Sequence, residues 1–472
     1  MIRGYVALRA AAVALVCSIA APAAVADSLV GVVQEALEGH PELAAIRFNR
    51  RAIDNELNAA RGLNLPTVDV KADVGRHREF SVTGNGIKDS NDWHDRDGVG
   101  TVFSQRIFDG FESQHEIARQ KNRVESARWR VNDTANSIAL RAVQAYLECN
   151  RARAVLSAAE ANLEAHRGLL ARVRQRADGG MANAAESTEA AARTANAKAI
   201  VAEAAARVQD AYALFKSVVG RMPAKLDAAS PARGLPRSVD DAVGEAVQVA
   251  PSVVATQFDA LAAEAAVGST YARFSPKLNF EVSTNHGWGL VEDNDKNYDA
   301  TAMLVVRWNL FNGGIDKARI WEARARAAEA DEISANTSRN VERETRISWN
   351  ALKAASVRVP ELREQLSLQR QRRSAYLEQF DVGQRRLLDI LDVQNEIFVV
   401  NSSLKTEELI GIYSSYRLLA AMGRLVPGLG LDMPLEAAQP PAENLIEGWR
   451  AEVNAVPREG YHSWSADTAP AK

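Results

Sequence analysis

Residues 65–74 read LPTVDVKADV, and residues 275–284, which lie 210 positions further along the chain, read SPKLNFEVST. After the proline of each stretch, apolar and polar residues alternate, which is the period of a β-strand with one apolar and one polar face. A return strand is expected after each stretch: the alternation is weak at Val99–Phe108 and clear at Ala302–Leu310. The sequence therefore predicts two β-hairpins, each with an exposed tip rich in Gly, Asp and Asn. The expected tips are residues 81–98 and 291–299.

These two stretches belong to an internal duplication. Three motifs of the first copy recur 203 positions later: Phe108-Asp109-Gly110, Gly180 and Gly220-Arg221 return as Phe311-Asn312-Gly313, Gly383 and Gly423-Arg424. A duplicated chain builds two copies of one structural unit. The expected parts are a leader at 1–26, a first repeat at 27–223, a linker at 224–240, a second repeat at 241–434, and a loosely ordered C-terminal tail at 435–472.

A very long helix is predicted after each β-hairpin. Phe111–Asp178 contains neither a proline nor a turn cluster, and as a helix it would reach about 100 Å. The matching run of the second copy, Ile315–Val382, contains Pro360, which we expect to bend or locally unwind the helix. Two shorter helices in each copy together match the long helix in length, so they can stack end to end beside it. Apolar residues recur every seven positions, as in a coiled coil, at Ile117, Val124, Val131, Ile138 and Ala145.

The first residues have the features of a cleavable secretory signal. Arg3 and Arg9 precede the apolar run Ala10–Ala21, and the small residues Ala24-Val25-Ala26 follow it. The mature protein is therefore expected to begin near Asp27, outside the cytoplasm.

Without the leader, Cys149 is the single cysteine, so no intramolecular disulfide can form. The formal net charge of −3 becomes more negative when the leader arginines are lost, which argues against nucleic-acid binding.

Beyond the leader, no segment approaches the ~20 consecutive apolar residues of a membrane-spanning helix. If strands cross a membrane instead, four are too few, because a closed barrel needs at least about eight. Several copies would have to combine, and both a dimer and a trimer satisfy this count.

Residues 382–396, VGQRRLLDILDVQNE, and residues 416–423, YRLLAAMG, resemble the second-repeat signature of TolC-like outer-membrane factors, most closely the type I secretion branch. The duplicated plan resembles that family up to about Pro434. The resemblance implies a fold that is mainly α with β: a homotrimer whose long coiled-coil helices form a periplasmic α-barrel, and whose two β-hairpins per chain contribute to a twelve-stranded transmembrane β-barrel in outer-membrane lipid. It further implies a passive exit duct, without a cofactor, for protein that an inner-membrane ABC transporter delivers through a periplasmic adaptor.

The resemblance also implies roles for residues near the helical turn of the second copy. Asp389 and Asp392 lie on one helical face, and in a trimer they would form two acidic rings at the periplasmic mouth. Alternatively, they are acids that suit the first turns of a helix. Arg385 and Phe380, with Glu186 of the first copy, correspond to the residues that latch the closed mouth. Phe380 lacks the hydroxyl of the family's tyrosine, and an ordinary solvated charge explains Arg385 equally well.

Gly180 and Gly383 are expected to mark the helix–turn–helix tips that meet the adaptor, although glycine at such turns also has a purely backbone explanation. The acids and histidine of residues 92–97 lack a recognised ligand spacing, so we expect a solvated loop and no metal site. The sequence contains no zinc-protease, phosphate-loop or nucleophile-elbow motif, and we expect that it is not an enzyme.

Two other functions fit the same residues. An outer-membrane factor of a multidrug or metal efflux pump would have the same fold and a different cargo. A periplasmic coiled-coil adaptor or scaffold would share the long helices but would leave the two β-hairpins unexplained.

Overall fold

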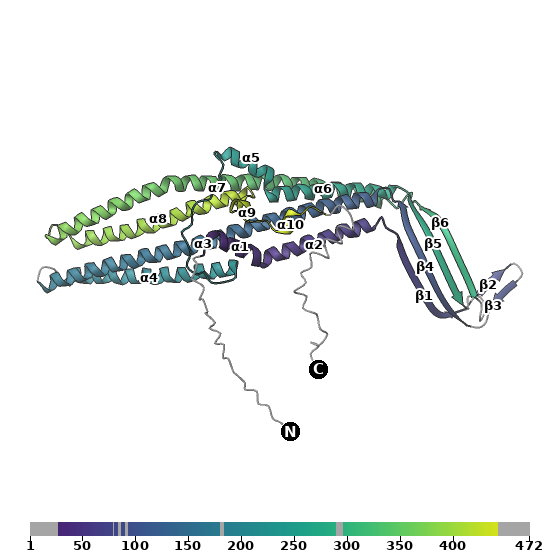
Figure 1. Ribbon diagram of the computed structural model, residues 1–472, viewed down its shortest axis with the longest axis horizontal. Helices are drawn as coiled ribbons and strands as arrows, with labels where there is room; N and C mark the ends of the chain where they lie inside the picture. Colours follow the sequence, from purple (N-terminus) through teal and green to yellow (C-terminus); the bar gives the residue numbers. More distant parts are fainter. Residues whose placement is uncertain are drawn as a thin grey trace, which may run out of the picture.

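The computed structural model describes residues 27–78, 80–83, 86–89, 93–179, 184–288 and 296–441, and it shows an elongated molecule with a β-sheet at one end (Figure 1). The expected leader and residues 442–472 lie outside the described residues. The first repeat contains α1 (Leu29–Gly39), α2 (Pro41–Gly62), β1 (Thr67–His77), β2 (Phe80–Thr83), β3 (Gly86–Asp89), β4 (His94–Phe108), α3 (Glu112–Asp178) and α4 (Ala184–Val219). The second contains α5 (Val239–Val249), α6 (Pro251–Tyr271), the 3-10 turn η1 (Ala272–Phe274), β5 (Lys277–Trp288), β6 (Lys296–Arg307), α7 (Ile315–Asp381) and α8 (Leu387–Ala421). Two short helices follow, α9 (Leu425–Gly428) and α10 (Leu435–Ala438).

The same local signals begin the helices of both repeats. The Ser28 hydroxyl accepts a hydrogen bond from the Gly31 N–H at 3.1 Å and caps α1. The Ser238 hydroxyl caps α5 in the same way, through the Asp241 N–H at 3.1 Å. A proline then opens both α2 and α6, where its missing N–H costs nothing.

The two long helices have the predicted extent, at 67 residues each. α7 runs through Pro360 without a break and is drawn in Figure 1 as one gently curved helix, so of the two expected outcomes, a bend or a local unwinding, the unwinding does not occur. A proline in the middle of a helix removes one hydrogen bond and crowds the carbonyl four residues earlier, but both effects are local, and the neighbouring turns can hold the helix together.

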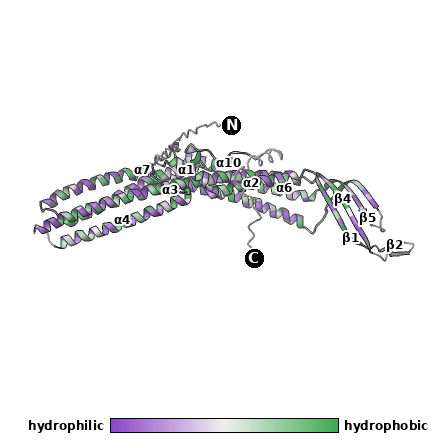
Figure 2. Ribbon diagram, turned by 60° about the horizontal axis from the view of Figure 1, so that its bottom comes forward, coloured by the Kyte–Doolittle hydropathy of each residue, from purple (hydrophilic) through white to green (hydrophobic). Residues whose placement is uncertain are grey.

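The shorter helices lie beside the long ones, as expected. α2 and α4 both pack against α3, and α6 and α8 both pack against α7 (Figure 1). α3 also packs against α6 and α8, so it joins the two repeats. Polar and apolar residues are interleaved along these helices (Figure 2). In the described part of the chain, no helix is both long and apolar enough to cross a membrane.

The four long strands form one antiparallel sheet in the order β1-β4-β5-β6, so the two hairpins meet where β4 pairs with β5. The register aligns Val68, Phe103, Val282 and Ala302 in one row across the sheet. Because facing residues of paired strands share a side, the alternating apolar residues of β1, β5 and β6 lie on one face, together with Val99 and Phe103 of β4. This confirms the predicted fold class, which is mainly helical with four strands from two hairpins.

The first β-hairpin tip, predicted as an exposed turn at residues 81–98, is wrong. β4 begins at His94, its pairing with β1 continues to His77, and the additional strands β2 and β3 lie between them. The alternation of side chains fades there, but the backbone hydrogen bonds of a ladder do not require it. His94, Asp95 and Asp97 therefore lie in a strand and not in a loop, while Asp92 lies outside the described residues.

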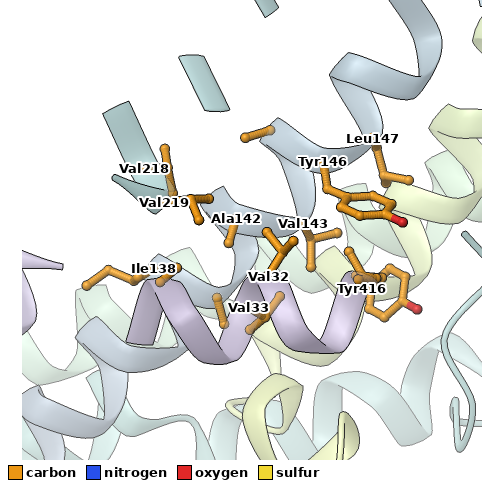
Figure 3. Close-up of a cluster of buried hydrophobic side chains, with 14 of the residues drawn as sticks. Val32, Val33, Ile138, Ala142, Val143, Tyr146, Leu147, Val218, Val219 and Tyr416 are labelled. Carbon is orange, nitrogen blue, oxygen red and sulfur yellow. The ribbon is translucent and has the colours of Figure 1, made fainter. Parts of the chain in front are cut away.

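The largest buried cluster lies where α1, α3, α4 and α8 meet. Val32 and Val33 of α1, Ile138 of α3 and Val219 of α4 point toward one another there (Figure 3). Cys149 belongs to the same cluster, and burial raises the pKa of its thiol to about 11. The thiol therefore stays protonated and unreactive at neutral pH.

Both described ends of the chain are tied to this central region. Asp27 forms a parallel bridge with Leu226 of the linker. The first residues of the tail are also packed, because the buried Glu436 of α10 forms ion pairs with Arg47 at 2.7 Å and Arg51 at 2.8 Å.

Candidate functional site: the tips of the two helical hairpins

The α7–α8 turn lies at the end of the molecule opposite the sheet (Figure 1). Gly383 has a φ of 80°, and its N–H donates to the Phe380 carbonyl at 3.0 Å. The Gln384 N–H donates to the Gln379 carbonyl at 2.8 Å, which completes a Schellman motif. This geometry gives Gly383 a backbone role, and its contact with an adaptor stays a prediction. Gly180, its counterpart in the first copy, lies outside the described residues.

Phe380 joins the second helical hairpin (α7 and α8) to the first (α3 and α4). Its side chain is only 4% exposed. Arg176 of α3 stacks on the Phe380 ring, with its guanidinium carbon 4.5 Å from the ring centroid, and donates to the Phe380 carbonyl at 2.6 Å. We call the surrounding residues the tip cluster: Leu169, Val173, Ala190, Phe380, Leu387, Ile390 and Leu391. Phe380 thus holds the hairpins together without a hydroxyl, and its role in a latch stays a prediction.

Arg385 has several partners within its own hairpin. Its guanidinium carbon lies 4.0 Å from the centroid of the Tyr376 ring, and its Nε donates to Gln379 Oε1 at 3.1 Å. Asp389 lies 3.7 Å from its Nη1. Glu186 lies in the first turn of α4. Arg385 is therefore more ordered than a freely solvated charge, and its contact with Glu186 stays a prediction.

Asp389 and Asp392 differ in their surroundings. Asp389 lies in the first turn of α8, where the helix dipole favours an acid, and Arg386 also approaches it at 3.4 Å. Asp392 lies beyond that turn, and its Oδ1 is 3.5 Å from Arg193 of α4. The helix dipole therefore explains an acidic residue at position 389 but not at position 392. Asp392 instead contributes to the contact between the hairpins, and the acidic rings stay a prediction.

Polar contacts also join the two hairpins, and they were not predicted from the sequence. Asn162 of α3 accepts from Gln394 Nε2 of α8 at 3.0 Å, and both side chains are buried. Within the second hairpin, Arg373 of α7 supports this contact by donating to Gln394 Oε1 at 2.8 Å. A second contact between the hairpins, the ion pair of Arg172 with Asp381 at 3.5 Å, lies nearer the tip. Such contacts could have been recognised from the sequence, because they place polar residues at heptad positions that are normally apolar.

The long helical hairpins of this chain end in a four-stranded sheet that has one apolar face. The crystal structure of the Campylobacter jejuni CmeC outer membrane channel superposes with a TM-score of 0.73 at 14% identity, over 90% of this chain and 89% of CmeC. The model of the outer membrane efflux protein family matches residues 32–221 and 242–424. The chain belongs to this family, and the match covers both repeats.

Two relatives support the assignment. Outer membrane efflux protein BepC of Brucella suis is 27% identical over 414 residues, which cover 87% of this chain and 89% of BepC. Outer membrane protein TolC of Vibrio cholerae is 21% identical over 415 residues, which cover 85% of this chain and 91% of TolC. The predicted family is confirmed, and membership places the protein at the outer membrane. The family and the matching structure are those of channels and not of enzymes.

Proposed function

We propose that three copies of this chain form a passive exit channel across the outer membrane, and that the channel serves a type I protein secretion system. The sheet carries the first part of this proposal. In the described chain, β1 and β6 are each paired on one side only, and apolar residues such as Val70 (71% exposed) and Leu304 (68% exposed) cover one face. An unpaired edge in lipid is costly, so pairing between copies into a closed barrel is the natural completion.

The second part rests on the resemblance of residues 382–396 and 416–423 to the type I secretion branch. In this proposal, the cleaved leader exports the chain, an adaptor contacts the tips near Gly180 and Gly383, and an inner-membrane ABC transporter supplies the energy. BepC is an efflux protein by name, which favours a second candidate, the outer-membrane factor of a drug or metal efflux pump.

The channel is tested first by the conductance of the detergent-purified protein in a planar bilayer, together with its native mass. We expect a trimer with small, cation-selective openings. A monomer without conductance would refute the proposed channel.

The acidic rings are tested by the double variant Asp389→Ala/Asp392→Ala. We expect a trimer with weakened cation preference, because three copies lose six carboxylates at the mouth. The matched control is Asp210→Ala/Asp331→Ala, which removes the same charge from exposed helical positions far from the tip. Equal reversal potentials for the two double variants would remove the role of the rings.

The latch is tested by Arg385→Ala, with Arg386→Ala as its control. Arg385 is bound by Tyr376 and Gln379, whereas the Arg386 side chain is 79% exposed. We expect larger single-channel conductance for Arg385→Ala only.

The cargo is tested separately in a strain from which the gene for this chain is deleted. Loss of a secreted protein with unchanged drug and metal tolerance supports type I secretion, and the reverse result supports efflux.

A further inference from the structure

His166 lies in the heptad seam of α3. The seven-residue spacing from Ile138 and Ala145 leads through Ala152 and Ala159 to His166 and then to Val173. These side chains are all buried, and His166 is 4% exposed. A polar side chain at such a seam position lowers the stability of the packing and marks a specific local function or register.

The neighbours of His166 lie at the contact between the two helical hairpins. One helical turn before it, Asn162 accepts the hydrogen bond from Gln394 of α8. One turn after it, the tip cluster begins at Leu169. From α4, the Thr194 hydroxyl donates to the His166 backbone carbonyl at 3.4 Å. The imidazole is therefore enclosed between a buried polar contact and a buried apolar one.

The Nδ1 atom of the His166 ring is buried and makes no hydrogen bond within the part of the chain that the structure describes. An imidazolium ion carries a proton on both ring nitrogens, so protonation would leave a buried N–H donor without an acceptor.

The surrounding charges also disfavour an imidazolium ion. Arg193 faces His166 from α4, and its charge is shared with Glu189 of α4 at 2.9 Å and with Asp392 of α8 at 3.5 Å. Arg373 of α7 approaches the same region through Gln394. Burial, and after it the positive charge of Arg193, lower the pKa of His166.

We propose that protonation of His166 loosens the contact between the first and second helical hairpins, so that mild acid opens this interface near the tips. The neutral imidazole fits the packed interface, whereas the imidazolium ion is stable only when the hairpins separate and water reaches the ring. The inference rests on the proposed gate for its biological role, but the loosening itself does not require conduction.

Linkage sets the direction and the upper limit of the effect. A histidine that is exposed in the separated state regains an ordinary pKa of about 6.5. Because the packed state holds the neutral form, its stability is constant above that pH and falls as the pH decreases. Between pH 8 and pH 5, the equilibrium constant for opening should therefore rise by up to about 30-fold.

The test is hydrogen exchange of the full-length, detergent-purified protein at pH 8 and pH 5, corrected for intrinsic exchange rates. The informative peptides are 162–173 of α3 and 387–394 of α8. In the wild type, we expect these peptides to lose protection at pH 5. His166→Gln, which stays neutral, should show no such change, and His166→Leu, which continues the apolar seam, should stay protected at both pH values.

The matched control is His40→Asn, which removes a different histidine and keeps an oxygen that can cap α2 in place of the His40 ring. It should respond to pH as the wild type does. Equal protection of the wild type at both pH values, or an unchanged pH response in His166→Gln and His166→Leu, would overturn the inference. Both results are independent of the bilayer measurement, so a protein that fails to conduct can still confirm or refute it.

Discussion

α3 and α7 have the same length and equivalent places in the two repeats, yet one is a core helix and the other is half uncovered. α3 buries residues along its whole length, from Ser113 to Val173, because α2, α4, α6 and α8 all pack against it. α7 is covered by α5, α6 and α8, and it buries few residues. Its exposed apolar side chains are Ile315, Trp321, Ile333, Ile347, Val357 and Leu368. Duplication thus supplied two similar helices, and a single chain supplies enough neighbours for only one.

The largest expected effect comes from the same substitution in both helices. Ile138→Ala empties a fully buried site in α3 and should lower the free energy of unfolding by about 2–5 kcal/mol. Ile347→Ala removes a side chain of α7 that is 44% exposed, and within one chain it should cost less than about 1 kcal/mol. Urea unfolding in detergent measures both.

Native mass spectrometry of the same variants sharpens the comparison. If another subunit covers α7, Ile347→Ala should clearly increase the fraction of dissociated protein, although it lowers the free energy of unfolding of one chain only slightly. Similar unfolding losses for the two variants, without dissociation, would contradict the different burial of the two helices.

A second pair of variants compares the glycines that end α4 and α8. Gly220 and Gly423 both have a positive φ, at 96° and 69°. A methyl group at Gly220 meets open space, so Gly220→Ala should cost only the left-handed conformation, about 1–2 kcal/mol. A methyl group at Gly423 would overlap the ring of Pro251, so Gly423→Ala should cost clearly more. Equal thermal midpoints for the two variants would show that the Pro251 contact relaxes easily.

A third pair compares two equivalent ion pairs. Arg221 binds Glu35 at 2.9 Å and also Asp27 through two hydrogen bonds of 2.9 Å, whereas Arg424 binds Glu245 at 2.7 Å. Paired hydrogen bonds to a carboxylate are stronger than a single exposed ion pair. Arg221→Ala should therefore lower the free energy of unfolding by about 1–2 kcal/mol, and Arg424→Ala by less than about 1 kcal/mol. An equal loss of unfolding free energy in both variants would mean that the hydrogen bonds of Arg221 with Asp27 do not contribute to stability.

The smallest effect is a pH dependence at Asp27. Its hydrogen bonds with Arg221, and after them one from the Ala224 N–H, lower the pKa of this carboxyl. A lowered pKa gives stability that is present above the unfolded value of about 3.9 and is lost as the pH falls toward the folded value. The gap in unfolding midpoint between wild type and Asp27→Asn should therefore be constant from pH 7 to pH 5 and narrow below pH 4. The control Asp210→Asn should show no such narrowing.

Much of the fold could be predicted because its signals are local. The alternation at 68–74, the proline at the start of α2 and the seven-residue spacing in α3 each depend on residues that are near neighbours in the chain. The extra strands β2 and β3 were missed, because their residues show the composition of a turn. Of the two outcomes expected at Pro360, a bend or a local unwinding, the unwinding does not occur, since the remaining turns of the 67-residue helix hold it together.

The candidate site was only partly predictable. The turn at Gly383 and the acids of α8 could be located from the sequence, but their partners could not. Arg193 meets Asp392, and Arg176 meets Phe380, although each pair is about 200 positions apart.

The duplication, the long helices, the two β-hairpins and the family can be read from the chain alone, because periodicity and repeated motifs are properties of the sequence. The central place of α3, the peripheral place of α7 and the contact of Asn162 with Gln394 beside the buried His166 follow from the packing of the whole molecule. The physical reason is that a helix with several apolar faces can be covered in several ways, and the choice depends on how all its neighbours pack at once.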